Sequence, residues 1–175
     1  MKPNKWLLRA ALGATSILLP SIAAASGHGS YKGEKTLGLR VGYVGHNQSA
    51  SAGLQFTYRF SRLFRLAPSL DYVVRHKDTD ALALAVDAQF LIPFSADRMA
   101  FYPYVGPKFA SWTLHPGKWH ESNDVTSRRS RLGLDAGVGI EANITPAFRA
   151  GVSAGYTFMN HTGGFDAVLT LSYRF

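Results

Sequence analysis

Eight segments of the chain place an apolar side chain at every second position. In the first segment, Leu37, Leu39, Val41 and Tyr43 alternate with small or charged residues. Successive side chains of a β-strand point to opposite faces of a sheet, so a period of two predicts a strand with one apolar face. Each segment is about ten residues long, which is the length that a tilted strand needs to cross a bilayer. The other seven segments begin at Leu54, Phe64, Leu82, Phe101, Leu132, Phe148 and Ala167.

The second face of these segments combines small residues with charges of both signs. A soluble sandwich would place many long charged side chains on the face that meets water, whereas Gly, Ala, Ser and Thr dominate this face. The interior of an eight-stranded barrel is only wide enough to be filled by side chains, so small residues and mutually paired charges suit it. The charged residues that we expect in such a lumen are Arg40, Arg59, Arg65, Asp71, Asp87, Lys108, Arg131, Asp135, Glu141, Arg149, Asp166 and Arg174.

The two faces together predict an all-β fold, an eight-stranded antiparallel up-and-down transmembrane β-barrel with its apolar face toward lipid. Aromatic residues gather toward both ends of the apolar face, where the two bilayer interfaces would lie. Phe60, Phe64 and Phe90 lie toward one end, and Tyr43 and Tyr72 toward the other. A soluble sandwich or a lipocalin-like barrel, with the apolar face turned inward, is the alternative.

The connections are predicted to alternate in length. Those after the second, fourth and sixth segments are tight, as at Ser61-Arg62 and Thr145-Pro146, and those after the odd segments carry polar loop residues, the longest from His115 to Ser130. Outer-membrane barrels have short periplasmic turns and longer outside loops, so this alternation fits an even number of strands. Pro103 and Pro107 lack the N–H that a sheet needs, and we expect both on the outer face near a strand end or a bulge.

The beginning of the chain is typical of a secretory leader rather than of a fold. Its basic first residues precede a short apolar run, and small residues follow up to Ala25. The apolar run is too short to span a bilayer as a helix. The predicted organisation is a signal peptide at 1–25, a short periplasmic segment at 26–35 and the barrel domain at 36–175.

Charge and cysteine content restrict the partners. Residues 26–175 hold sixteen basic and eleven acidic residues, a net charge of +5. This mild excess suits anionic lipid headgroups or polysaccharide, and no nucleic-acid partner is expected. The chain has no cysteine, so a disulfide, a thiolate metal site and a lipid anchor on cysteine are excluded. No cofactor or metal is expected.

Two segments of the chain have the character of motifs. One is Tyr102-Pro103-Tyr104-Val105-Gly106, and the other is the end of the chain, with Leu169, Leu171, Tyr173 and Phe175 as its apolar positions. Both resemble segments of the small outer-membrane β-barrel family that includes OmpA-type transmembrane domains and OmpX-like proteins. The first is similar to a segment common in such barrels, and the second is similar to the family's C-terminal assembly signal. The resemblance implies outer-membrane location and insertion by the barrel-assembly machinery with periplasmic chaperones. It also implies contact with outer-membrane lipid and lipopolysaccharide, and it leaves the specific role open.

The longest loop is the main candidate for binding at the surface. Arginine and lysine side chains there are suited to lipopolysaccharide phosphates, acidic glycans or other host and cell-surface ligands, and a tryptophan is suited to anchoring a partner. The alternative is an ordinary hydrated loop. A metal site formed by histidines of several loops is a further alternative, but no ligand spacing supports it. The candidate binding residues are His115, Lys118, Trp119, His120, Arg128 and Arg129.

Enzymatic and transport functions are less well supported. Barrel deacylases of lipid A use a His-x-Ser pair with a glutamate, a base-activated nucleophile, but His161 here is followed by Thr162 and Gly163, and Asp166 replaces the glutamate. Barrel acyltransferases carry an amphipathic helix before the first strand, and the glycine-rich stretch before Leu37 does not suit one. A filled lumen leaves no open channel. We therefore expect a non-enzymatic, structural or adhesin-like protein, with a lipid-A-modifying enzyme or a narrow pore as alternatives.

Overall fold

The computed structural model describes residues 33–46, 48–76, 79–96, 98–114, 127–160 and 163–175. Nine β-strands account for most of them. Within these ranges no helix is long and apolar enough to cross a membrane. The strands are β1 (Lys35–Val44), β2 (Ser49–Arg59), β3 (Phe64–His76), β4 (Thr79–Phe90), β5 (Ile92–Phe94), β6 (Met99–Leu114), β7 (Ser127–Asn143), β8 (Phe148–Phe158) and β9 (Gly164–Arg174).

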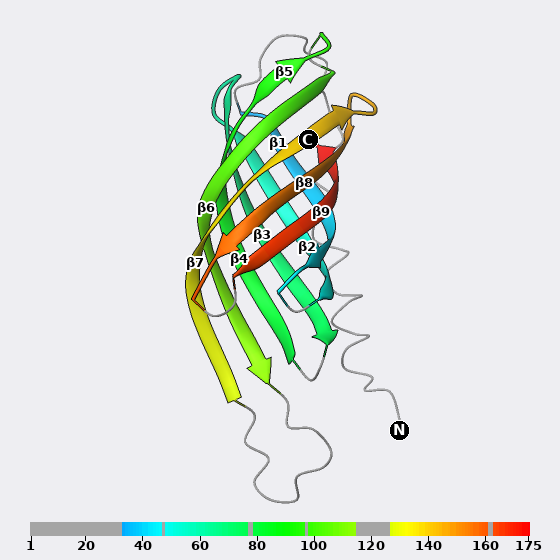
Figure 1. The fold of residues 1–175 in the computed structure, drawn as a ribbon. Helices are drawn as coiled ribbons and strands as arrows, with labels where there is room; N and C mark the ends of the chain where they lie inside the picture. Colours follow the sequence, from blue (N-terminus) through cyan, green and yellow to red (C-terminus); the bar gives the residue numbers. More distant parts are fainter. Residues whose placement is uncertain (1–32, 47, 77–78, 97, 115–126, 161–162) are drawn as a thin grey trace, which may run out of the picture.

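The strands form one closed antiparallel sheet (Figure 1). Neighbours in sequence pair with each other, β1 pairs with β9, and β4 pairs with β6 to close the ring. The short strand β5 continues β4 in an unchanged register, since Gln89 lies opposite Tyr104 and Ile92 lies opposite Phe101. At the interruption, the backbone N–H of Leu91 donates to the carbonyl of Leu63 on the other side. Because β4 and β5 occupy one strand position, the nine strands form an eight-stranded barrel. The predicted fold class is confirmed.

The barrel has two different ends, which we name by their connections. The turn end carries the connections at 60–63, 95–98 and 144–147, the strand β5 and the C-terminus, and the loop end is the opposite one (Figure 1). At the loop end β6 and β7 are the longest strands, with 16 and 17 residues, and they extend beyond their neighbours (Figure 1). Short turns of outer-membrane barrels face the periplasm, so the loop end faces outward.

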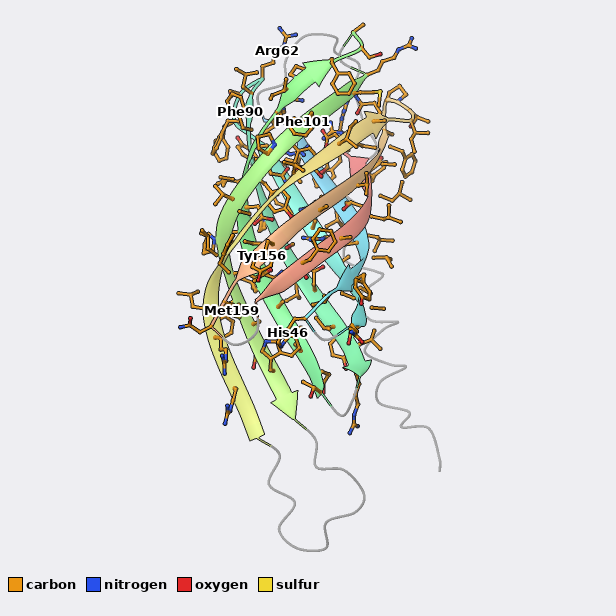
Figure 2. All side chains as sticks on the ribbon, viewed as in Figure 1. His46, Arg62, Phe90, Phe101, Tyr156 and Met159 are labelled. Carbon is orange, nitrogen blue, oxygen red and sulfur yellow. The ribbon has the colours of Figure 1, made fainter. Side chains whose placement is uncertain are left out.

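The two faces of the sheet follow the predicted assignment. Leu39, Leu132 and Leu169 are 62%, 73% and 63% exposed, while Arg65 and Arg149, on the inner face, are 3% and 6% exposed. Figure 2 shows Phe90 and Phe101 toward the turn end and Tyr156 further toward the loop end, and all three side chains are exposed. A soluble fold would reverse this distribution, because burying charge and exposing a continuous apolar surface are both unfavourable in water. The soluble alternative is therefore wrong.

The predicted alternation of connection lengths is only partly right. β3 runs through His76 and β4 begins at Thr79, so two residues separate these strands, and the connections after β1 and β8 span four and five residues. The turns at the other end span four residues each. Only the connection between β6 and β7 is long. The strands continue into polar segments that were predicted to be loops. This is possible because the backbone hydrogen bonds between paired strands do not require apolar side chains.

Proline placement is also corrected in one respect. Pro103 and Pro107 lie on the outer face, as predicted, but both are inside β6, opposite Val138 and Leu134. The register between β4 and β6 is the same on both sides of Pro107, where Ala85 pairs with Lys108 and Ala88 with Val105. The strand therefore accommodates Pro107 without a bulge and away from its ends.

Candidate functional site in the barrel interior

The charged side chains of the lumen gather in two groups. One group, near the turn end, is called the inner cluster, and the other, toward the loop end, is called the outer cluster. Each contains acidic and basic residues from strands that are distant in sequence. The inner cluster consists of Glu34, Arg59, Arg65, Glu141, Arg149 and Arg174. The outer cluster consists of Arg40, Asp71, Lys108, Asp135 and Asp166.

The inner cluster is built on two carboxylates. Glu141 accepts two hydrogen bonds from Arg65, with Nη1–Oε1 and Nη2–Oε2 distances of 3.1 and 2.8 Å. Such a fork-to-fork pair fixes geometry as well as charge. The Nε–H of Arg65 donates to Gln89 Oε1 at 2.6 Å, and its guanidinium lies 5.3 Å from the ring centre of Tyr102. Arg149 Nη1 lies 3.4 Å from Glu141 Oε1 and extends the network.

Glu34 is the second carboxylate of the inner cluster, and the sequence-based prediction missed it. It accepts a hydrogen bond from Arg149 Nη2 at 2.7 Å, and its Oε2 lies 3.4 Å from Arg174 Nε and 3.9 Å from Arg59 Nη1. The predicted periplasmic segment at 26–35 includes it and lies outside the predicted barrel. Continuing the alternation backwards from Leu37 would have put Glu34 on the inner face, since even-numbered positions of β1 point inward.

The outer cluster is centred on one lysine. The Nζ of Lys108 lies 2.7 Å from Asp166 Oδ2 and 3.3 Å from Asp135 Oδ2, and it donates to Thr157 Oγ1 at 2.9 Å. The hydroxyl of Thr157 also lies 2.8 Å from Asp166 Oδ2. All three donor positions of this ammonium group therefore have acceptors. Arg40 Nη1 faces Asp71 Oδ2 at 3.4 Å as a second ion pair.

Two tyrosines lie where the two clusters meet. Tyr104 lines a cavity that belongs to the outer cluster, and Tyr102 lines a smaller one beside the inner cluster, of about 270 Å³ when the part open to solvent is included. Their ring centres are 6.4 Å apart. A Cβ added to Gly139 would lie 2.3 Å from Tyr102 Cζ, and one added to Gly155 would lie 2.3 Å from the Tyr104 oxygen. Glycine at these positions leaves room for the tyrosine rings, which extend over the neighbouring strands β7 and β8 on the inner face.

The cavity of the outer cluster reaches the loop end, and we call it the outer chamber. Its volume is about 660 Å³ when the part open to solvent is included. His46 and Met159 line it where β1 and β8 end, and Figure 2 shows both side chains at the loop end. Trp112 lines it from β6, with its ring centre 5.7 Å from that of His46 in an edge-on contact.

The remaining predicted lumen charges occupy other positions. Asp87 lies between the clusters, 4% exposed, with no ion pair to any described residue and no hydrogen-bond donor to its Oδ1 among them. The backbone of Asp87 in β4 lies beside Gly106 of β6, and Gly106 pairs on its opposite side with Asp135 of β7. Arg131 lies near the loop end, where its guanidinium donates to the backbone carbonyl of Asn160 in an exposed setting. It therefore belongs to neither cluster.

The predicted surface-binding residues are only partly described. His115, Lys118, Trp119 and His120 lie outside the described residues. The other two are in β7: for Arg128 only the backbone is described, and Arg129 is exposed and lies directly opposite Trp112 of β6. Within the described ranges, no three His, Asp or Glu side chains are grouped as metal ligands would be.

The predicted assembly-signal residues all lie on the outer face. Tyr173 and Phe175 are 37% and 52% exposed at the turn end, and Tyr173 stacks obliquely on Phe148 with ring centres 5.4 Å apart. The N–H of Phe175 donates to the carbonyl of Lys35 at 3.1 Å. The last strand thus ends beside the first one, where the barrel closes.

A closed eight-stranded barrel with an apolar belt outside and paired charges inside defines an integral membrane protein of the bacterial outer membrane. The sequence matches the family described as "Outer membrane protein beta-barrel domain" over residues 7–175. The chain belongs to this family and is located in the outer membrane. A direct comparison with curated protein sequences found no match.

Solved structures of small outer-membrane barrels share the fold. The N-terminal β-barrel domain of OprF from Pseudomonas aeruginosa is 17% identical, with a TM-score of 0.62 over 82% of this chain and 98% of that one. Ail, the attachment invasion locus protein of Yersinia pestis, is 18% identical, with a TM-score of 0.59 over 82% and 99%. Neisserial surface protein A is 14% identical, with a TM-score of 0.56 over 81% and 93%.

Proposed function

We propose that this protein is a non-catalytic barrel whose specific role is adhesin-like, the binding of anionic glycans at the loop end. The observation that carries the proposal is the projecting hairpin of β6 and β7, which brings a tryptophan and an exposed arginine together. Trp112 and Arg129 are direct cross-strand partners there, and Arg131 follows two residues later on the same face. Guanidinium groups bind phosphate and sulfate through paired, charge-assisted hydrogen bonds.

The interior supports a non-catalytic role. A deacylase would need an acidic partner for a histidine near the lipid surface, but Asp166, the acid nearest in sequence to His161, is directed into the lumen and bound to Lys108 and Thr157. Its side chain is 9% exposed. A carboxylate engaged in this way is not available to orient a surface base.

A protein with the same fold has been crystallised with a ligand of the chemistry proposed here. Ail of Yersinia pestis has been crystallised with the heparin analogue sucrose octasulfate. For the present chain we propose the phosphate groups of lipopolysaccharide and sulfated or phosphorylated glycans of other cells as ligands. Both present the multiple anionic oxygens that the arginine side chains of the hairpin recognise.

Binding to immobilised heparin and to purified lipopolysaccharide tests this proposal. Protein extracted in an uncharged polyoxyethylene detergent should bind both, and binding should weaken as salt rises because exposed charges are screened. Arg129→Gln together with Arg131→Gln should lower affinity about tenfold, since two exposed ion-pair contacts of about 0.7 kcal/mol each are lost. Arg98→Gln, an exposed arginine at the turn end, is the matched control. Equal affinities of the double variant and the control would overturn the proposal.

We also propose that the barrel-assembly machinery and periplasmic chaperones act on this chain. The alternating apolar residues Leu169, Leu171 and Tyr173 are exposed along β9 and end at Phe175. A strand at the closing seam with one free apolar face is suited to recognition by strand addition before closure.

A further inference from the structure

The backbone pairing divides the barrel wall into two continuous parts. From β6 through β7, β8, β9 and β1 to β2, the residue pairs of each ladder follow one another without a gap. The hairpin of β3 and β4 is likewise continuous from Phe64–Phe90 to Val73–Ala81. The wall therefore consists of a six-stranded sheet and one hairpin, which are joined by two seams, β2–β3 and β4–β6 (Figure 1).

The seam between β2 and β3 is interrupted at a proline. Its pairing breaks off at Gln55–Ser69 and resumes at Tyr58–Leu66, and Pro68 lies in the gap. A proline has no N–H to donate to a neighbouring strand. The two residues that each strand contributes to this gap are therefore in register but not paired.

The seam between β4 and β6 has the same defect. Its pairing breaks off at Ala85–Lys108 and resumes at Ala88–Val105, and Pro107 lies in the gap. A further gap separates this short paired stretch from the pairing of β5 with β6. Both edges of the hairpin are thus joined to the six-stranded sheet by interrupted ladders.

The prolines withhold their N–H groups from the seams and not from the hairpin itself. Successive residues of a strand direct their backbone groups alternately to the two neighbouring strands. The carbonyl of Phe64 accepts from the N–H of Phe60, which follows β2, so the even-numbered residues of β3, including Pro68, face β2. A Cβ added to Gly106 would collide with the carbonyl oxygen of Val86, so the even-numbered residues of β4 face β6.

The two interruptions lie at one level of the wall. Pro68 pairs with Val86 across the hairpin, and the register places Val86 opposite Pro107. The lumen side of the hairpin carries Ala67 and Asp87 at this level. Ala67 has no polar side chain, and Asp87 forms no ion pair with any described residue. Ladder hydrogen bonds hold neighbouring strands together in a bilayer, so the hairpin is held less firmly here than the strands of the six-stranded sheet are.

Ion pairs fix the hairpin on either side of this level. Toward the turn end, Arg65 of β3 binds Glu141 of β7. Toward the loop end, Asp71 of β3 faces Arg40 of β1. The hairpin is therefore tied across the lumen above and below the prolines, and the weak level lies between the two ties.

We propose that the hairpin of β3 and β4 is a movable segment of the barrel wall. Its seams with β2 and β6 open at the level of Pro68 and Pro107, while the six-stranded sheet stays paired. The ion pairs on either side limit the movement and return the hairpin to its place. This movement belongs to the membrane-spanning wall and does not depend on the glycan-binding rim.

Hydrogen exchange resolved by residue tests the proposal. NMR on the full protein in phospholipid nanodiscs compares even-numbered amides of the hairpin, such as Leu70 and Leu84, with odd-numbered ones, such as Ser69 and Ala85. The even-numbered amides face the seams and should exchange at least about tenfold faster than the odd-numbered ones, which stay bonded within the hairpin. In β8 and β9, whose ladders are continuous, the two sets should exchange at similar rates. Equal rates within the hairpin, or the same difference in β8 and β9, would overturn the proposal.

Replacing the prolines tests their part in the movement. Pro68→Val combined with Pro107→Val supplies an N–H at each gap, the second beside the carbonyl of Val86. This variant should reduce the difference between even-numbered and odd-numbered amides to the level of β8 and β9. Pro146→Val, in the turn between β7 and β8, is the matched control and should leave the difference unchanged. An undiminished difference in the double variant would contradict the proposed hinge. The comparison on the unaltered protein decides the question even if the double variant does not fold.

Discussion

The bidentate pair of Arg65 and Glu141 permits a quantitative test of how the barrel interior contributes to stability. Arg65→Met keeps most of the volume of the side chain and removes its charge. The substitution eliminates both hydrogen bonds to Glu141, at 3.1 and 2.8 Å, and the bond to Gln89 at 2.6 Å. It also removes the guanidinium from the ring of Tyr102. Glu141 and Gln89 are 9% and 3% exposed, so water does not readily replace these partners.

The expected loss in the free energy of unfolding is about 3 kcal/mol. Removing one partner of a buried ion pair costs about 3–5 kcal/mol, because the other charge stays buried without compensation. The lower end applies here because Arg149 Nη1 remains 3.4 Å from Glu141. Adding Glu141→Gln to Arg65→Met removes the uncompensated charge. The double variant should therefore lose at least about 1 kcal/mol less than the sum of the two single variants.

Reversible urea unfolding in phospholipid vesicles, followed by tryptophan fluorescence, measures these differences. Folded protein is verified independently by its altered gel mobility in SDS without boiling. Arg98→Met, at an exposed position of the turn end, is the control and should change stability by less than about 0.5 kcal/mol. If Arg65→Met resembled this control, or if the double variant showed no recovery, the paired charges would not be the source of stability in the lumen.

Two further predictions concern assembly and conductance. Replacing Phe175 by Ser should slow insertion and leave precursor in the periplasm, as pulse-chase fractionation would show. Phe148→Ser, which alters another exposed phenylalanine at the turn end, should have a smaller effect. Normal insertion of the Phe175 variant would contradict the assembly role. Tyr102→Ala with Tyr104→Ala should raise ion conductance in planar bilayers above the low, fluctuating level expected of the unaltered protein, because each ring lines one of the two cavities and its removal enlarges that cavity. Unchanged conductance would mean that other groups close the path.

The sequence was sufficient for the fold and for the two faces, because both follow from a period of two. Leu39 and Arg65 were assigned to the correct sides from alternation alone. Partner choice was not predictable in the same way. Arg65 and Glu141 are 76 positions apart, and their contact depends on which strands close the ring and in what register. Several arginines on the inner face were equally plausible partners of Glu141 until the register was known.

Loop length was the weaker prediction for a different physical reason. Polar residues such as His76 suggested loops because they lie beyond the apolar belt. A strand of a barrel can continue into water, however, since its neighbours satisfy its backbone groups whatever its side chains are. The same continuation produces the long hairpin of β6 and β7, which carries Trp112 and Arg129. The side-chain composition of a strand therefore indicates where the apolar belt ends, whereas the backbone hydrogen bonds to neighbouring strands determine where the strand itself ends.

The two clusters differ in how their charges are joined. The inner cluster contains four arginines and two glutamates, and each glutamate joins arginines from different strands. Glu34, just before β1, contacts Arg59 of β2, Arg149 of β8 and Arg174 of β9, so it ties the beginning of the barrel to its end. These contacts occupy the hydrogen-bond acceptor positions of the Glu34 carboxylate, and they join strands on both sides of the seam where the barrel closes. The outer cluster, by contrast, is centred on the single ammonium group of Lys108, which joins Asp135 of β7 to Asp166 of β9, while Arg40 of β1 pairs with Asp71 of β3. Both clusters therefore contain residues from strands on the two sides of the seam between β1 and β9, and this arrangement favours closure of the ring over alternative pairings of the strands.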